Sequence, residues 1–152
     1  MSELKNISID GTGKTPKIEF NQERGDLILI GRSIPENASL VYEPLLEWIN
    51  DYIKSPFHTT NLYLNLEYFN SATSIWFAKM VRALSKITGK DKVFIIHLYF
   101  DMQDYKNMDT DDLSDMVSTL VGNISDVKVS IGLKIHGINR ERKTVKDTMI
   151  FI

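Results

Sequence analysis

The chain has 152 residues, of which 43% are hydrophobic and 25% charged, and this length and composition fit one compact domain better than two. Its formal net charge of -2 argues against a general electrostatic attraction to nucleic acid or to an anionic membrane. The sequence contains no cysteine, which excludes disulfides, thiolate nucleophiles, zinc-thiolate sites and iron-sulfur clusters.

The N-terminal segment 1–14 has neither the basic leader nor the apolar stretch of a signal peptide, and we expect it to be a flexible leader. No apolar run in the chain approaches the ~20 residues that a membrane-spanning helix needs. We therefore expect a soluble, cytoplasmic protein that neither inserts into a membrane nor binds nucleic acid.

The first half of the chain predicts a hairpin, a helix and a long strand. Alternation over 17–20 and an apolar run over 27–30, with a turn between them, predict an antiparallel hairpin. Helical spacing predicts a helix over 41–53, in which Pro44 should kink the helix or confine regular hydrogen bonding to the later turns. Alternation over 59–69 predicts a strand whose one face carries Leu62, Leu64, Leu66 and Tyr68.

The second half continues with helices and strands in turn. In order, the pattern predicts a helix over 76–87, a strand over 93–99, an acidic loop over 101–112, a helix over 113–121 and a strand over 127–135. Asp109 or Thr110 caps the last helix and Gly122 stops it. The extension 139–152 is of uncertain structure, because its pattern fits either a frayed tail or an added edge strand.

This order of elements predicts a single α/β domain over 1–152. Strands that are separated by helices pair most simply in parallel, so we expect a sandwich around a mixed, mainly parallel sheet of about five strands. Many unrelated functions occur on such folds, and the function must therefore be argued from a site.

A glycine-rich segment near the N-terminus resembles the end of a phosphate-binding P-loop. Gly11-Thr12-Gly13-Lys14-Thr15 has the glycines and the lysine, but Ser8 stands where the first motif glycine belongs. Pro16 and a strand pattern replace the helix that would receive the phosphates. We therefore interpret the segment as part of the leader.

Histidines and aspartates offer a second candidate chemistry. His97 lies among apolar strand residues, and Asp101 and Asp104 follow the same strand, so the three could hold a small ligand or a metal, or supply an acid and a base. No metal-ligand spacing supports this, and a hydrogen-bonded histidine beside a solvated acidic loop is the simpler interpretation. We expect neither a metal nor another cofactor.

A cluster of hydroxyl residues, Asn70-Ser71-Ala72-Thr73-Ser74, follows the strand at 59–69 and opens the next helix. Free amides and the positive end of the helix dipole at such a position accommodate a phosphate. Phosphorylation would add about -1.5 to -2 charges there. Capping of the helix by Asn70 or Ser71 is the plainer alternative.

Several blocks of the sequence are similar to the SiaC-type family of bacterial regulatory phosphoproteins. The blocks are Thr15-Pro16-Lys17-Ile18-Glu19-Phe20, Gly31-Arg32-Ser33-Ile34-Pro35-Glu36-Asn37-Ala38, Tyr42-Glu43-Pro44-Leu45-Leu46-Glu47-Trp48 and Leu66-Glu67-Tyr68-Phe69-Asn70-Ser71. Their order and spacing match the family over about the first half of the chain.

This resemblance implies a STAS-like fold, similar to that of SpoIIAA, without catalytic activity. It implies that a Ser/Thr kinase phosphorylates Ser71 and that a PPM-type phosphatase dephosphorylates it. The phosphorylation state then controls binding to a target such as a diguanylate cyclase, whose cyclic-di-GMP output governs biofilm formation. Thr73 or Ser74 could replace Ser71 as acceptor, because Ala72 interrupts the hydroxyl run and Ile75-Trp76 stand where the family has a lysine.

A binding surface is expected where the two helices begin. Glu36 and Asn37 precede the first helix and Asn70 and Ser71 precede the second, so all four should lie at loop edges of the sheet and contact partners. Trp48 or Trp76 could anchor a partner there, although core packing is the commoner fate of tryptophan. An oligomerising scaffold is a third possible function, and the sequence predicts no oligomeric state.

Overall fold

The computed structural model describes residues 4–122, 124 and 127–152, which form one sheet and its covering helices. The elements are β1 (Ile7–Ile9), β2 (Lys17–Asn21), β3 (Asp26–Ser33), α1 (Ala38–Tyr52), β4 (Thr59–Phe69), α2 (Ser71–Leu84), β5 (Val93–Asp101), α3 (Met102–Asn107), α4 (Thr110–Val121), β6 (Ser130–Ile138) and β7 (Thr144–Phe151). Across this described part, no helix has the length and apolar character needed to cross a membrane.

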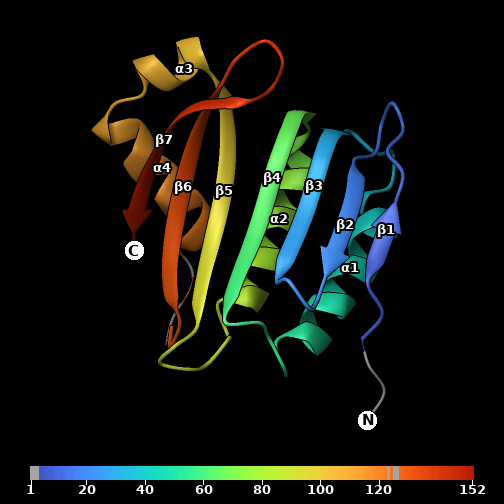
Figure 1. The fold of residues 1–152 in the computed structure, drawn as a ribbon. Coiled ribbons are helices and arrows are strands. Elements are labelled where there is room, and N and C mark those ends of the chain that lie inside the picture. The colour runs from blue at the N-terminus through green and yellow to red at the C-terminus, as the bar shows by residue number, and fades with distance from the viewer. Residues whose placement is uncertain (1–3, 123, 125–126) are drawn as a thin grey trace.

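The seven described strands lie side by side in sequence order, from β1 at one edge to β7 at the other (Figure 1). The three pairs between β3 and β6 are parallel, and the pairs β1–β2, β2–β3 and β6–β7 are antiparallel. The sheet is mixed, as predicted, but it has seven strands rather than about five, and it is not mainly parallel, because half of the six described strand pairs are antiparallel. Short connections at both edges impose antiparallel pairing, whereas the helical crossovers allow parallel pairing.

The additional strands come from the two ends of the chain. β1 pairs with β2, so the segment 1–14 contributes an edge strand where a flexible leader was expected. β7 pairs with β6 along most of its length, so the extension 139–152 adds an edge strand, which is one of the two alternatives that its pattern left open. The strand predicted over 127–135 begins at Ser130 and continues to Ile138.

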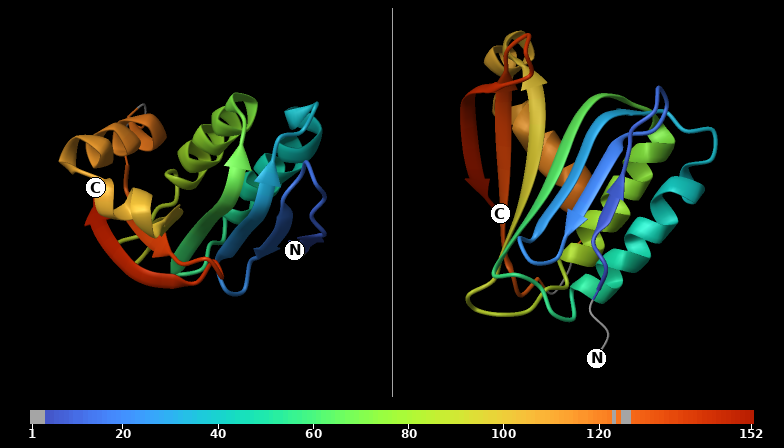
Figure 2. Two further views of the ribbon diagram at one scale, coloured as in Figure 1. Left: turned by 90° about the horizontal axis from the view of Figure 1, so that it is seen from above. Right: turned by 45° about the vertical axis from the view of Figure 1, so that its right-hand side comes forward.

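The described helices all lie on one face of the sheet, and α1, α2 and α4 follow one another across it (Figure 2). This two-layer arrangement is the α/β sandwich that the alternation of strands and helices predicts. α1 begins at Ala38 and runs through Pro44, so regular helix is not confined to the turns after the proline. The opposite face of the sheet carries none of the described helices.

The hydrophobic core lies between the sheet and the helices. Every second side chain of the central strands points toward the helices, where it meets the apolar stripes of α1 and α2. The completely buried side chains of this core include Phe20, Leu27, Leu29, Tyr42, Ile49, Tyr52, Leu62, Met80, Val81, Leu84, Phe94 and Ile96.

β4 follows the predicted alternation only as far as Leu66. A register shift against β3 then leaves Glu67 as an extra residue, and such a bulge changes which face the following side chains occupy. Phe69, expected on the face opposite Leu66, packs against Phe77 of α2 with the ring centroids 5.7 Å apart. Phe69 therefore belongs to the helix side of the sheet.

The acidic segment 101–112 contains α3, a helix that the sequence pattern did not predict. α3 packs onto β6 at Gly137, where an added Cβ would lie 2.6 Å from Met102 Sδ and 2.8 Å from Tyr105 Cγ. Glycine thus permits the close approach of α3. The Tyr105 hydroxyl also lies 2.6 Å from Thr148 Oγ1, so α3 joins β6 and β7.

Candidate functional site

The carboxyl ends of β3 and β4 lie next to the beginnings of α1 and α2, at one end of the strands (Figure 1). Ser33 and Phe69 form the last pair of this parallel ladder, and the Asn70 amide donates to the Ser33 carbonyl over 3.0 Å. In parallel sheets, this end of the strands is where ligand and modification sites collect. Both segments singled out in the sequence, Glu36-Asn37 and Asn70-Ser71, follow these strand ends.

Asn70 is the N-cap of α2. Its Oδ1 accepts hydrogen bonds from the Thr73 amide over 3.0 Å and from the Thr73 hydroxyl over 2.9 Å. The first turn of a helix leaves its amides without helical acceptors, and a capping side chain satisfies one of them. Asn70 thereby fixes the first turn of α2, in which Ser71 is the first residue.

Buried hydroxyl groups support this cap from the core. Ser33 Oγ lies 2.8 Å from Thr73 Oγ1 and is also hydrogen-bonded to the Tyr42 hydroxyl. Burial raises the pKa of Tyr42 to about 12, and its hydrogen bond with Ser33 offsets only part of that effect. The phenol therefore stays protonated at neutral pH. Each hydroxyl can donate to the next, in the order Tyr42, Ser33, Thr73 and Asn70 Oδ1, which joins α1, β3 and α2.

The three hydroxyl side chains of the cluster differ in accessibility. Ser71 is exposed, Thr73 is completely buried, and Ser74 is half-buried. The Ser74 hydroxyl donates to the Ser71 carbonyl over 2.7 Å, and the Thr73 hydroxyl belongs to the buried network. A modifying enzyme could reach Thr73 only by unfolding the first turn, whereas Ser71 meets solvent in the folded protein.

Glu36 and Asn37 are both exposed just before α1. Glu36 Oε1 lies 2.9 Å from the Nζ of Lys14, in the loop before β2. Asn37 stands at the N-cap position without capping the helix, because its Oδ1 accepts from the Ser39 hydroxyl over 2.7 Å instead. Lys14 is followed by a strand rather than a helix, which confirms that the P-loop resemblance of 11–15 fails.

The two tryptophans have different environments. Trp48 is 6% exposed, its Nε1 donates to the Lys5 carbonyl over 2.7 Å, and its ring stacks on Tyr52 at 5.2 Å. Trp48 therefore belongs to the core and is not available as an anchor. Trp76 is half-buried, with the Nζ of Lys79 4.3 Å from its ring centroid, and part of its surface is open to a partner.

The alternative site of His97, Asp101 and Asp104 is not assembled. His97 alternates with the core side chains of β5, and its ring nitrogens contact His136 Nε2 at 2.9 Å and Asn61 Oδ1 at 2.8 Å. Asp101 accepts from the Asp104 amide over 2.9 Å, and Asp104 lines a groove on the opposite, helix side. Within residues 4–122, 124 and 127–152, no three His, Asp or Glu side chains form a group that could hold a metal.

His97 and His136 form a buried pair on the helix-free face of the sheet. His97 stacks on Tyr63 and His136 stacks on Tyr99, with ring centroids 4.1 and 4.3 Å apart. Burial is the main cause that lowers the pKa of His97, to about 3, and burial also lowers the pKa of His136. Both rings are therefore neutral near pH 7, and they bind β5 to β6.

Sequence reasoning missed Ser33 as a partner of the hydroxyl cluster. The signal was present, because alternation from Leu27 and Leu29 puts Ser33 on the core face, where a polar side chain needs a partner. The His97–His136 contact left no comparable signal. It depends on the register between strands that the spacing of one sequence does not fix.

Comparison with known families places most of the chain in one of them. The model of the SiaC family regulatory phosphoprotein matches residues 9–126. Among individual proteins, an uncharacterized protein of Pseudomonas aeruginosa strain UCBPP-PA14 is 27% identical over 70 residues, which are 46% of this chain and 56% of that protein. The match thus spans little more than half the length of this relative.

Solved structures of SiaC from Pseudomonas aeruginosa have the same fold. Apo-SiaC has a TM-score of 0.63 at 18% identity, and the superposition covers 84% of this chain and 98% of that one. The structure of the diguanylate cyclase SiaD in complex with its activator SiaC gives a TM-score of 0.65 at 18% identity, covering 86% and 99% of the two chains. At this identity the likeness extends to the fold alone.

Proposed function

The chain belongs to the SiaC family of regulatory phosphoproteins, and we propose that it is a binding protein without catalytic activity whose phosphorylation on Ser71 controls its partner. A Ser/Thr kinase adds the phosphate and a PPM-type phosphatase removes it. The controlled partner is a diguanylate cyclase, the class of enzyme that SiaC of Pseudomonas aeruginosa activates. Its cyclic-di-GMP output would then govern biofilm formation.

The exposure of Ser71 beside the buried Thr73 is the observation that carries this proposal. Of the two, only Ser71 offers a hydroxyl that a kinase can reach without unfolding α2. Asn70 already satisfies the Thr73 amide, and the amides of Ser71 and Ala72 precede it in the first turn. These amides and the positive end of the helix dipole favour a phosphate at this position.

A phosphate on Ser71 would change the charge of the partner surface strongly. It adds about -1.5 to -2 charges to a chain whose formal net charge is -2. Glu36, at the same end of the strands, carries a negative charge and forms an ion pair with Lys14. The added charge would attract cationic side chains of a partner and repel acidic ones, and in this way it would change the affinity for the controlled partner.

Intact-mass spectrometry, together with tandem mass spectrometry of its peptides, tests the assignment of Ser71 in protein purified from cells of its source organism. The wild type should carry one phosphate that maps to residue 71, and treatment with a PPM-type phosphatase should remove it. Ser71→Ala should carry none, whereas the matched variant Ser74→Ala should be modified like the wild type. Undiminished phosphorylation of a folded Ser71→Ala protein would move the acceptor elsewhere and overturn the proposal.

A binding comparison tests the switch itself. The unmodified and phosphorylated wild type should differ in their retention of a diguanylate cyclase, and Ser71→Ala should always behave as the unmodified form. Equal retention of the cyclase by both forms would contradict control by this phosphate.

A further inference from the structure

A groove of about 660 Å³ lies between α2 and α4 on the helix side of the sheet. Phe77 and Ala78 of α2 line one wall, Met116 and Leu120 of α4 line the other, and β4 and β5 form the floor. α4 contacts α2 less extensively than α1 does. The groove lies between the apolar side chains of α2 and α4 where the two helices do not fill the layer.

The sheet also opens beneath this groove. Among the described residues, the β4–β5 ladder ends at the pair Leu64–Leu98, although each strand stays paired with its outer neighbour to its end. The two strands consequently separate toward their carboxyl ends (Figure 1). Leu66, Phe69 and Phe100 lie beyond the last pair and line the groove. Their apolar side chains deepen it where the strands part.

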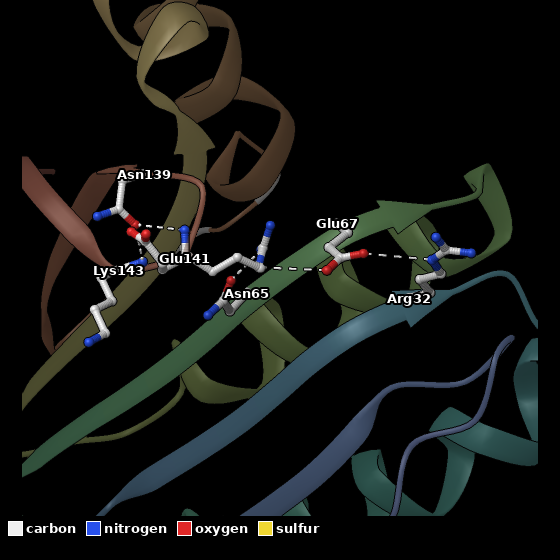
Figure 3. A network of polar contacts seen from close by, with 7 residues as sticks. Arg32, Asn65, Glu67, Asn139, Glu141 and Lys143 are labelled. Atoms are coloured by element: carbon white, nitrogen blue, oxygen red, sulfur yellow. Dashed lines mark hydrogen bonds and ion pairs between the residues drawn. The ribbon is translucent and has the colours of Figure 1, made fainter.

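On the helix-free face, Arg142 crosses the split between the two strands. It belongs to the β6–β7 turn, and its Nη2 donates to Asn65 Oδ1 of β4 over 2.6 Å. Asn139 holds this turn, because its Oδ1 accepts from two backbone amides of the turn at 3.0 Å each (Figure 3). A peptide strand that inserted between the ends of β4 and β5 would have to displace Arg142. A partner therefore reaches the groove from the helix side of the sheet.

The groove combines an apolar surface with a negatively charged rim. Its floor and walls are mainly leucine, phenylalanine and methionine side chains, and its polar lining includes the carboxylates of Asp104, Asp112 and Asp115. All three aspartates are exposed. In the described part of the chain, no lysine, arginine or histidine lines the groove. An occupant that matches it must be apolar on one side and cationic along the border.

We propose that this groove binds a helix of the regulated target, which presents an apolar face flanked by lysine or arginine side chains. The proposal rests on the proposed regulatory function and names the surface that the target uses. Such a helix would bury its apolar face between α2 and α4, as amphipathic helices do in apolar grooves of other proteins. Its cations would meet the three aspartates, which orients the helix and speeds its association.

The geometry of α4 favours a helix over an extended peptide. Asp112, Asp115, Met116 and Thr119 line the groove at spacings of three and four residues, so α4 presents one continuous face to it. Faces of this kind pack against another helix, ridge into groove. The surface is also continuous with the proposed phosphorylation site, because Ser74 lines the groove within the first turn of α2, close to Ser71.

Site-specific photocrosslinking in cells of the source organism tests the proposal. A benzophenone amino acid at position 119, which is exposed in the groove, should crosslink a protein partner, and the crosslinked segment can be sequenced by mass spectrometry. We expect a segment with apolar residues at helical spacing and lysine or arginine beside them. Asp115→Lys in the same protein should reduce the crosslink several-fold.

The control carries the benzophenone at position 50, on the exposed surface of α1, and should not capture the same segment. Absence of a crosslink from position 119, or a crosslinked segment that is acidic or lacks helical spacing, would overturn the proposal. Ser71 phosphorylation is measured in the same cells. The crosslink is compared between cells in which Ser71 is phosphorylated and cells in which it is not. No groove crosslink in either state refutes the docking site alone, and equal crosslinking in both states refutes the switch alone.

Discussion

The hydroxyl of Thr73 lies 2.8 Å from the hydroxyl of Ser33, and both groups are completely buried beneath the exposed Ser71. This contact joins the first turn of α2 to the end of β3. Because Thr73 also bonds to the capping side chain of Asn70, the backbone at Ser71 is fixed from the core rather than from the surface. A phosphate on Ser71 would therefore act on an ordered helix end.

Thr73→Val removes the central hydroxyl of this network with little change in shape. The Ser33 hydroxyl and Asn70 Oδ1 each lose a partner in a buried place, and such a loss costs roughly 1–3 kcal/mol. Urea denaturation should show a decrease of that size in the free energy of unfolding. The matched variant Thr88→Val, at an exposed threonine, should remain close to the wild type. Equal stability of the two variants would contradict the network.

Asn70→Ala should destabilise the protein more than Asn37→Ala does. Both asparagines stand at N-cap positions, but only Asn70 accepts a hydrogen bond from a helix amide. Loss of a capping side chain costs roughly 0.5–2 kcal/mol, whereas the Asn37 side chain bonds only the Ser39 hydroxyl. Thermal unfolding of both variants makes the comparison. Equal losses, or a larger loss for Asn37→Ala, would refute the role of Asn70 as cap.

Local periodicity predicted the interior elements of the fold. The strand predicted over 59–69 has the same bounds as β4. Asp109, one of the two residues predicted to cap the next helix, is the N-cap of α4. At the edges, the pattern missed β1 and left β7 as one of two alternatives, because edge strands bury little. β7 is exposed along nearly its whole length, so no buried face imposes an apolar period on it. α3 has no buried residue of its own and depends on its packing against Gly137.

The candidate site was predictable in place but not in detail. A polar cluster between a strand and a helix located Asn70-Ser71 at the edge of the sheet, and the family resemblance singled out Ser71. Which hydroxyl is buried could not be deduced from the cluster, because Ser33 and Tyr42, which enclose Thr73, come from other elements. The bulge at Glu67 likewise depends on the register between β3 and β4.

Arg142→Ala should increase the mobility of β4 beyond its last pair with β5, because it removes the hydrogen bond that spans the gap between the two strands. The hydrogen bond from Nη2 to Asn65 joins a charged donor to a half-buried acceptor, and its loss should cost about 1–2 kcal/mol. Amide hydrogen exchange in residues 65–69 should become faster. Arg140→Ala, at an exposed position in the same turn, is the matched control and should exchange like the wild type.

A glycine at position 142 distinguishes the effect of the lost side chain from the effect of backbone strain. Arg142 has a φ of 60°, in the left-handed region that glycine adopts without strain. Arg142→Gly should therefore show the same faster exchange as Arg142→Ala, but with a smaller loss of stability. Exchange as slow as in the wild type in either variant would show that the arginine side chain does not restrain the end of β4.

Acid should destabilise the protein through the buried histidines. The folded-state pKa of His97 is lowered from 6.5 to about 3. Between these two pH values, His97 therefore binds a proton in the unfolded chain but not in the folded protein. The stability that His97 contributes is therefore complete above about pH 6.5 and is lost as the pH falls toward 3. Each unit of pKa difference corresponds to about 1.4 kcal/mol.

His97→Gln tests this pH dependence. The variant should be less stable at neutral pH, because the contacts with His136 and Asn61 are lost, but its free energy of unfolding should fall less steeply between pH 6.5 and 4. His136 keeps its own lowered pKa, so part of the slope should remain. His58→Gln removes an exposed histidine outside the pair and should retain the wild-type slope. Parallel profiles for wild type and His97→Gln would mean that carboxylates, rather than the buried pair, set the sensitivity to acid.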